Sequence, residues 1–334
     1  MTLGCERPKA PDVRPFSRVA SNARRALSAL DAGGGAVLEV EDREARLDLM
    51  SRDYAALPAD VRRRTLVIEP SRAGRDALTH RIRAELVQRG ELGSEALNGH
   101  RLVRRDMTRA EATDVRSYAA GDILLFNKDY ADKGVSRMTA YRVVEIDRDK
   151  GHLTLADSAD RQVQWHPRRW GSGKVSAFTP ADIELRIGDQ IAFTRNDRAQ
   201  GRVNGQQAEV ISVHADTQTA SVRVASGRIE TLHLDRTSDQ HITHSYVATA
   251  FAAQGRTADR VIISADSADT HLVNQRSFYV AISRAKEVTR VYTDDRARLV
   301  HAVQERAGLK QTALLAGRPA ITPAERSAAS VLGL

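Results

Sequence analysis

The stretch FYVAISRAKEVTRVYTDD, residues 278–295, decides the fold, because it predicts a helix, a strand and the start of a second helix in succession. Phe278, Ile282 and Ala285 recur at i, i+4 and i+7, which is one apolar helix face able to lie on a sheet. Arg284 falls off that face. The β-branched segment after it predicts a short strand, and the final Thr-Asp-Asp predicts caps for a following helix. Arg284 is then either a solvated helix-edge residue or a placed functional group.

Length and composition predict a cytoplasmic protein of two or three compact units. The chain has 334 residues, of which 41% are hydrophobic and 28% charged. Its first fifteen residues hold no apolar run suited to a signal peptide, and no later stretch approaches the roughly 18 apolar residues that span a bilayer. The single cysteine, Cys5, can form neither an internal disulfide nor a zinc site alone. No metal site is expected.

The charge balance favours a polyanionic partner. The net charge is +8, and only seven of the 51 basic residues are lysine. The arginine excess has two explanations that the sequence leaves open: a GC-rich genome, or the match between the planar guanidinium and phosphate oxygens.

The segments before the middle of the chain predict half of a βαβ unit. RTLVIEP, residues 64–70, is a short apolar run ended by proline, and residues 71–90 follow with helical spacing at Ala77, Ile82 and Leu86. Gly90 is the expected stop of that helix. Two further amphipathic segments, SRVASNARRALSAL and REARLDLMSRDYAAL, precede the strand.

The middle third predicts an all-β insertion with an internal repeat. GDILLF at residues 121–126 recurs as GDQIAF at 188–193, and alternating strands follow each copy, as two small β-barrels in series would require. VIIS then marks a return to buried parallel strands. The expected division is an α/β part at 1–118, the β insertion at 119–240, a second α/β part at 241–308 and a loosely held tail at 309–334.

Two segments carry a family resemblance. VATAFAAQGRTADRVII at residues 247–263 and NQRSFYVAISRAKEVTRVYTDD at 274–295 together resemble motifs V and VI of superfamily 1 DNA helicases, especially the helicase half of conjugative relaxases. Residues 64–83 look like motif IV, and GDQIAFTRNDRAQGRVNGQQAEV looks like the barrel segment of that group. The resemblance covers residues 17–298. It implies a RecA-like second motor domain, a parallel sheet with helices on both faces, interrupted by one or two SH3-like barrels.

The same resemblance implies roles at the nucleotide. Arg284 would be the arginine that reaches across a cleft to the γ-phosphate of ATP, where charge builds during hydrolysis. Arg75 and Arg72 would be the motif IV contacts to nucleotide. The alternative for that pair is that both solvate the outer face of a helix.

Motif V would couple nucleotide to DNA. Thr249 and Gln254 match the DNA-contacting positions of the family, and Gly255 and Thr257 match positions close to the nucleotide. Phe251 stands where the family usually has histidine. An aromatic side chain there either stacks on a base or is buried.

The β insertion holds further DNA-binding candidates. Asn196 and Asn204 match the family pattern RND…NG, although Asn-Gly is first of all a hairpin turn. Trp165 and Trp170 alternate with arginines in WHPRRW, a combination that suits single-stranded DNA. Packing at a barrel rim explains the two tryptophans equally well.

Some helicase parts are missing from the sequence. No GxxxxGK[ST] loop is present, and WGSGKVSAF only imitates one, because valine follows Lys174 and the surroundings predict strand and loop. No acidic Walker B pair is found. His241 and His244 lie at i, i+3, but because no further ligands accompany them they are expected to be surface residues rather than metal ligands. ATP and Mg²⁺ would then be bound mainly by a first motor domain outside this chain.

The expected function is the second motor domain of an ATP-dependent 5′–3′ DNA helicase of conjugative plasmid transfer, incomplete on its own. Its implied partners are single-stranded DNA, an N-terminal motor and relaxase domain, and a type IV secretion coupling protein. The alternative is a non-enzymatic module that binds DNA or docks on the secretion machinery. Salt-dependent strand binding without a nucleotide effect would favour that alternative.

Overall fold

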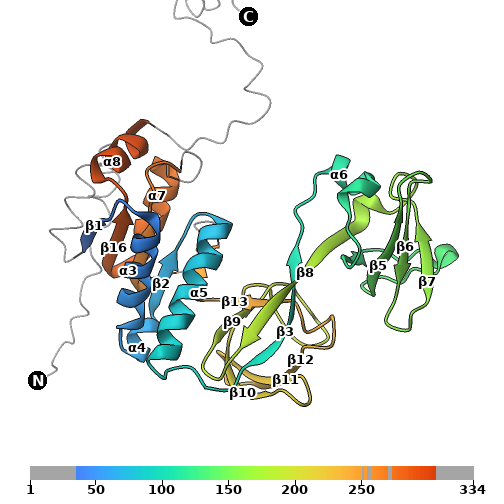
Figure 1. Ribbon diagram of the computed structural model, residues 1–334, viewed down its shortest axis with the longest axis horizontal. Coiled ribbons are helices and arrows are strands. Elements are labelled where there is room, and N and C mark those ends of the chain that lie inside the picture. The colour runs from blue at the N-terminus through green and yellow to red at the C-terminus, as the bar shows by residue number, and fades with distance from the viewer. Residues whose placement is uncertain (1–34, 250–251, 254–256, 270–272, 306–334) are drawn as a thin grey trace, which may run out of the picture. The chain divides into compact units, whose positions relative to one another are not determined.

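The computed structural model describes residues 35–249, 252–253, 257–269 and 273–305 (Figure 1). Two compact units divide the chain. One takes its residues from 1–50, 57–75 and 248–334, and the other from 51–56 and 76–247. We name them the parallel unit and the antiparallel unit, after their sheets. The predicted tail at 309–334 and the amphipathic segment at 17–30 lie outside the described residues.

The parallel unit is built on a five-stranded sheet in the order β1-β16-β15-β2-β14. Its neighbours β1 and β16, β16 and β15, and β15 and β2 pair in parallel, which confirms the predicted α/β fold with a parallel sheet. The strands are β1 (Ala36–Glu39), β2 (Thr65–Ile68), β14 (Val247–Ala248), β15 (Ala258–Ser264) and β16 (Ala285–Thr293). The helices that begin in these parts of the chain are α3 (Arg43–Ala55), α4 (Ala59–Arg62), α5 (Arg72–Gln88), α7 (Gln275–Ile282) and α8 (Arg296–Glu305).

Both faces of the parallel sheet are buried, as continuous apolar strands require. On one face Val261 and Val291 pack in a cluster with Phe278 of α7 and Leu299 of α8. The alternate positions, among them Ile262, are buried as well. Helix α8 begins as the sequence predicts, because the carboxylate of Asp295 accepts a hydrogen bond from the backbone N–H of Arg298 at 2.8 Å.

The antiparallel unit contains two sheets. One has the order β12-β11-β10-β9-β13 and the other β3-β8-β4-β5-β6-β7. The strands are β3 (Leu97–Arg104), β4 (Ile123–Phe126), β5 (Ala140–Asp147), β6 (His152–Ala156), β7 (Gln162–Trp165), β8 (Val175–Leu185), β9 (Gln190–Phe193), β10 (Gln207–His214), β11 (Thr219–Val224), β12 (Ile229–His233) and β13 (Ile242–His244). The short helices are α6 (Arg109–Thr113), η1 (Val115–Ser117), η2 (Ala131–Lys133) and η3 (Ser172–Lys174).

The antiparallel sheets begin earlier in the chain than the expected residue 119. Strand β3 pairs with β8 over eight positions, from Leu97 opposite Leu185 to Arg104 opposite Phe178. Only Leu97 and Leu102 of β3 are buried, so its alternation in the sequence is weak. Its strand identity comes from a partner some eighty residues away, which local patterning does not reveal.

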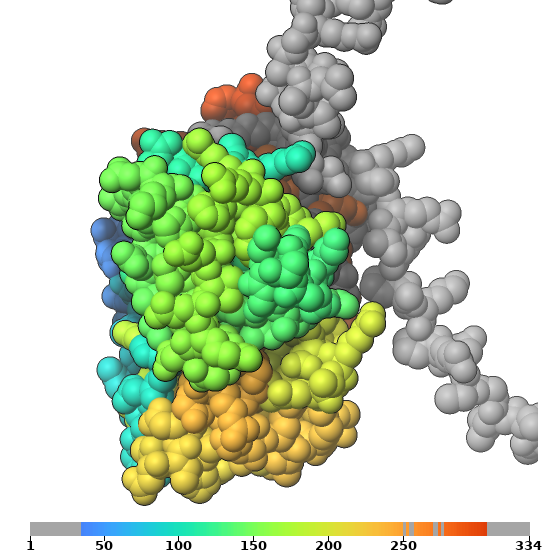
Figure 2. All heavy atoms as spheres, turned by 90° about the vertical axis from the view of Figure 1, so that its right-hand side faces the viewer, coloured from blue at the N-terminus to red at the C-terminus, as the bar shows by residue number. Residues whose placement is uncertain are grey.

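Each half of this unit has its own apolar core. Trp165, Phe126 and Tyr141 centre the cluster of β4–β7, and Phe193 and Ile191 belong to the cluster of β9–β13. Figure 2 shows a face of the unit on which residues of β4–β7, in green, and of β10–β12, in yellow, reach the surface.

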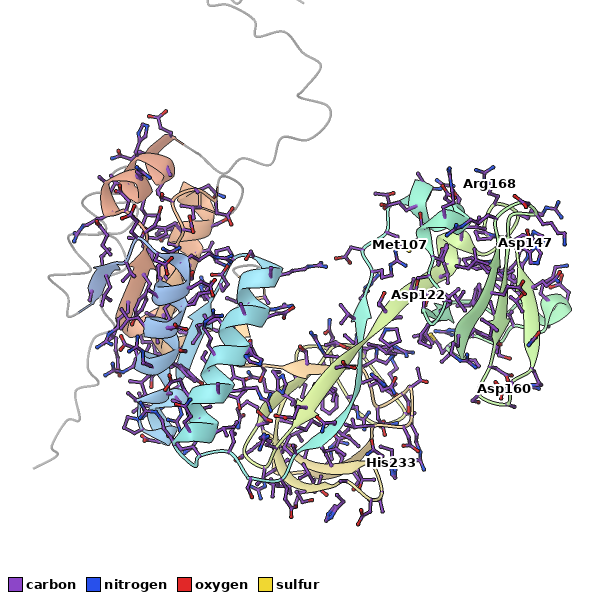
Figure 3. The ribbon with its side chains drawn as sticks, viewed as in Figure 1. Met107, Asp122, Asp147, Asp160, Arg168 and His233 are labelled. Atoms are coloured by element: carbon purple, nitrogen blue, oxygen red, sulfur yellow. The ribbon has the colours of Figure 1, made fainter. Side chains whose placement is uncertain are left out.

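The internal repeat builds the same local structure twice. Gly121 and Gly188 both have positive φ, at 88° and 93°, a conformation that favours glycine. The aspartates that follow, Asp122 and Asp189, are 2% and 0% exposed, and each accepts a backbone N–H from three residues earlier, at 2.9 and 2.8 Å. Each also pairs with an arginine. Asp122, which is labelled in Figure 3, additionally accepts a hydrogen bond from the hydroxyl of Thr179 of β8 at 3.0 Å.

Candidate functional site

The segment around Arg284 differs in one respect from its predicted form. Helix α7 ends at Ile282, and β16 already begins at Ala285, so Arg284 lies in the connection rather than on the helix. Phe278 is buried against the sheet as predicted, but Ala285 contacts the core from the strand. The strand starts earlier because Ala285 pairs with Ala258 of β15, a contact that no helical pattern predicts.

Arg284 is held by the end of its own helix. Its backbone C=O accepts from the N–H of Ala258 at 2.9 Å. Its Nε donates to the carbonyl oxygen of Val280 at 3.0 Å, and its Nη2 lies 3.0 Å from Ser283 Oγ. The guanidinium is half-buried in this arrangement. A side chain fixed on two of its nitrogens is preorganised, so it loses little conformational entropy if it binds a ligand.

The amino edge of the parallel sheet, where Arg284 lies, carries other charged groups. Arg64 precedes β2 and pairs with Asp259 at 3.0 Å, and Lys286 Nζ lies 3.6 Å from the same carboxylate. Arg64 also pairs with Asp60 at 3.2 Å, so three basic side chains, those of Arg64, Arg284 and Lys286, share this edge with two carboxylates. An anionic ligand would be attracted to it.

Arg72 and Arg75 lie at the opposite edge. Helix α5 begins with Arg72, just after the carboxyl end of β2, and its first turn is capped by Ser71 Oγ, which accepts from the N–H of Gly74 at 2.9 Å. The register places Ala258 of β15 beside Ala285, and Ile263 beside Ile68. Five residues of strand, about 17 Å, therefore separate the two levels.

Sheet topology is the physical reason for this separation, because a helix between two parallel strands returns the chain from the carboxyl edge to the amino edge. Arg284 follows such a helix, α7, whereas Arg72 and Arg75 lie in the first turn of α5, which begins at the carboxyl edge after β2 and leads to β3 of an antiparallel sheet. The motif IV pair and Arg284 would therefore approach a nucleotide from different levels of the sheet. A nucleotide role for the motif IV pair stays a prediction.

Only part of motif V lies within the described residues. Phe251, Gln254 and Gly255 lie outside them. Thr249 follows β14, and its Oγ1 accepts a hydrogen bond from the N–H of Ala252 at 3.1 Å. Thr257 is exposed immediately before β15. Thr257 therefore shares the amino edge with Arg284.

The asparagines of the β insertion have a structural role. Asn196 Oδ1 accepts from the backbone N–H of Asn204 at 2.8 Å, and Gly205 adopts a φ of 83° before β10 begins. The side-chain amide thus closes the loop between β9 and β10, as the turn interpretation requires. Both asparagines are exposed, so a DNA contact stays a prediction.

The tryptophans occupy a core rather than a binding surface. Trp165 is fully buried and donates its indole N–H to the carbonyl oxygen of Trp170 at 2.9 Å. Trp170 is half-buried, with its ring stacked 5.9 Å from Phe126. The stacking role predicted for Trp165 is therefore wrong, because its ring has no face left for a base. Trp170 stays a DNA-binding prediction with a smaller available surface.

Two other sequence expectations have clear outcomes. Lys174 ends the short helix η3 and is followed by strand β8, whereas a phosphate-binding loop leads into a helix. The prediction that WGSGKVSAF is not a Walker A loop is therefore confirmed. His241 is only 4% exposed, which makes the predicted surface position wrong. Burial, followed by the charge of Arg195, lowers the pKa of His241 to about 4. Burial also lowers the pKa of His244 to about 4.

Sequence reasoning missed a polar network in the antiparallel unit. Asp189 accepts two hydrogen bonds from Arg83, at 2.8 and 2.9 Å, and one from the hydroxyl of Tyr246 at 2.9 Å. Burial by itself lowers the pKa of Arg83, but the hydrogen bonds and charges of Asp189 and Glu184 outweigh burial, so the pKa of Arg83 is raised. The repeated Gly-Asp pair in the sequence could have indicated this network, because a buried aspartate needs a cationic partner.

In the described part of the chain, no group of three or more His, Cys, Asp or Glu side chains is placed to hold a metal ion. None of the described helices combines the length and apolar character needed to cross a membrane.

Comparisons with known proteins find similarity to superfamily 1 helicases and to conjugation proteins. A family model described as the viral superfamily 1 RNA helicase core domain matches residues 179–293. The multifunctional conjugation protein TraI of Escherichia coli (strain K12) is 27% identical over 253 residues, covering 73% of this chain and 14% of TraI. The conjugal transfer protein TraA of Rhizobium radiobacter is 31% identical over 128 residues, covering 37% of this chain and 11% of TraA.

Among solved structures, Bacteroides Pif1 bound to ssDNA aligns with a TM-score of 0.37 and 14% identity, over 97% of this chain and 56% of Pif1. The chain spans 14% or less of the length of the two curated relatives. The family match and the conjugation proteins confirm the resemblance to superfamily 1 helicases of conjugal transfer.

Proposed function

We propose that this chain, which carries a domain similar to superfamily 1 helicases of conjugation proteins, is the second motor domain of an ATP-driven 5′–3′ DNA translocase in plasmid transfer. The observation that carries the proposal is the place of Arg284. It lies between a packed helix and a parallel strand, at a basic sheet edge, within a sequence that matches motif VI. Arg284 would supply the arginine finger.

The proposed chemistry is electrostatic. During phosphoryl transfer the equatorial oxygens of the γ-phosphate carry the developing charge, and a guanidinium held rigidly beside them lowers the barrier. Val280 O and Ser283 Oγ hold the guanidinium of Arg284 before any ligand arrives. Thr257 lies at the same edge and would contact the nucleotide from motif V.

ATP and Mg²⁺ fit this chain only in part. The basic side chains at the amino edge suit phosphate oxygens, whereas the described residues offer no carboxylate set for a metal ion. Mg²⁺ would therefore arrive with the nucleotide, held by a Walker-type phosphate loop. The 334 residues contain no GxxxxGK[ST] sequence, so that loop would belong to another motor domain.

The test mixes this chain with a separately expressed Walker A domain of a conjugation helicase and measures ATP hydrolysis stimulated by single-stranded DNA. The chain alone should show little turnover, and the mixture should show more. Arg284→Ala should lower turnover in the mixture about a thousandfold. It should leave strand binding nearly unchanged. Arg148→Gln, at an exposed turn, removes the same charge as a control.

Two results would overturn the proposal. One is robust ATP hydrolysis by the pure chain. The other is an Arg284→Ala mixture as active as the unmodified one.

The second candidate is a non-enzymatic module that binds single-stranded DNA or docks on a secretion coupling protein. A pocket in the antiparallel unit that is lined by three arginines favours it. The discriminating measurement is strand affinity with and without ATP analogues. Affinity that depends on salt but not on nucleotide supports the module, and a nucleotide-sensitive affinity supports the motor.

A further inference from the structure

The antiparallel unit contains a pocket that joins the RND segment, residues 195–197, to side chains outside the motifs. Its volume is about 550 Å³, within the range of ligand sites. Its walls come from the β4–β5 region and from the loops after β9 and β12: Leu125, Arg137, Met138, Ala140, Arg195, Asn196, Asp197, Arg198, Thr237, Ser238 and His241.

The lining of the pocket is cationic. It includes Arg137, Arg195 and Arg198 but only one carboxylate, Asp197. In the part of the chain that the structure describes, none of the three arginines forms a salt bridge. Many other arginines of this unit do, including Arg83, which pairs with two acids. A pocket with three guanidinium groups and one carboxylate keeps an excess of positive charge, which favours an anionic ligand.

His241 is a buried polar residue in the wall of the pocket and contacts Arg195. The residue is 4% exposed, and Arg195 Nη1 lies 3.2 Å from its Nε2. Because a guanidinium only donates, Nε2 is the acceptor and the proton of the neutral ring is on Nδ1. Nδ1 is buried with no hydrogen-bond partner. Nδ1 has almost no accessible surface, so the contribution of His241 to the pocket is the hydrogen bond that its Nε2 accepts from Arg195.

The surroundings keep Arg195 in place. Burial lowers its pKa, opposed by the charge of Asp197. Its Nη2 also lies 3.7 Å from Met138 Sδ, in the loop before β5. The guanidinium therefore touches both walls of the pocket. Asn196, the motif residue beside it, already uses its side-chain oxygen to close the β9–β10 loop.

We propose that this pocket is an oxyanion site of the phosphate class, in which Arg137, Arg195 and Arg198 bind tetrahedral oxygens and neutral His241 orients Arg195 by accepting a hydrogen bond from its Nη1. A phosphodiester of a DNA strand and a free sulfate or phosphate ion offer the same oxygens. The volume leaves room for a phosphate with an attached sugar. The site goes beyond the motor function, and its test needs neither nucleotide nor a partner domain.

The experiment uses the full chain and four variants: Arg137→Gln, Arg198→Gln, Arg195→Gln and the control Arg148→Gln. Arg137 and Arg198 are exposed, so these variants should fold even if Arg195→Gln does not. One measurement is the shift in melting temperature between sodium sulfate and sodium chloride at equal ionic strength. The other is the anisotropy of a labelled oligothymidylate, with sulfate as competitor.

Each pocket variant should lose the sulfate-specific part of the melting shift, and Arg148→Gln should keep it. Strand affinity should fall about tenfold per pocket arginine, the effect of losing a charge-assisted hydrogen bond. The slope of log affinity against log salt should shrink by about 0.7. A loss of the sulfate effect with unchanged strand binding would identify a free ion as the ligand. Unchanged sulfate and strand binding in all three variants would overturn the proposal.

Discussion

Replacing Asp189 with asparagine should destabilise the antiparallel unit more than the same change at Asp122 or Asp160. Asp189 is 0% exposed and accepts four hydrogen bonds: two from Arg83, one from Tyr246 and one from the backbone N–H of Arg186. Asparagine keeps the shape but presents an NH₂ group to donors that need an acceptor.

The size of the destabilisation depends on how deeply the arginine that loses its carboxylate partner is buried. Arg83 is only 11% exposed, so it would stay buried with Glu184 as its remaining partner. Breaking a buried ion pair from one side costs about 3–5 kcal/mol. In Asp122→Asn the arginine left behind, Arg105, is 31% exposed and can regain water, so a loss of about 1–3 kcal/mol is expected. Asp160, at an exposed turn (Figure 3), should tolerate asparagine within about 0.5 kcal/mol.

The assay is urea unfolding followed by far-UV circular dichroism and by tryptophan fluorescence. Both tryptophans, Trp165 and Trp170, belong to the antiparallel unit, so fluorescence reports on that unit alone. The expected order of destabilisation is Asp189→Asn, then Asp122→Asn, then Asp160→Asn. A loss below 1 kcal/mol for Asp189→Asn, or one no larger than for Asp122→Asn, would refute the reasoning from burial.

Three further outcomes are expected. Burial lowers the pKa of His244 in the folded protein from 6.5 to about 4, so the unfolded chain binds this proton at a higher pH than the folded chain does. The free energy of unfolding should therefore fall by up to about 3 kcal/mol as the pH drops from 6.5 to about 4. A His244→Gln chain should show a flatter dependence of this free energy on pH in the same urea titrations. Trp165→Ala should cost about 3–5 kcal/mol by emptying a core position, while the folded protein keeps its oligothymidylate affinity in anisotropy titrations; a large affinity loss in folded protein would restore the stacking role. Gly74→Ala should cost about 1–3 kcal/mol in urea unfolding followed by circular dichroism, because the new Cβ would contact the Glu69 carboxylate, whereas Gly173→Ala, with open space around it, should be neutral.

The sequence by itself determined the elements whose signals are local. The helix ending before Gly90, the apolar strands of the parallel sheet and the alternating strands after each Gly-Asp pair all follow from periodicity and turn residues. The motif VI segment also revealed its helix and strand, and the resemblance to superfamily 1 helicases, because its residues are contiguous. These signals need no knowledge of distant partners.

Only the tertiary structure decided which side chains meet and which are buried. Strand β3 exists through β8, and Trp165 and His241 are buried by residues far away in the sequence. The parallel topology separates Arg72 from Arg284, although both stand in segments that resemble helicase motifs. Burial and proximity depend on packing between residues that are far apart in the sequence. The sequence indicates them only where a repeated motif, such as Gly-Asp, forms the same local structure twice.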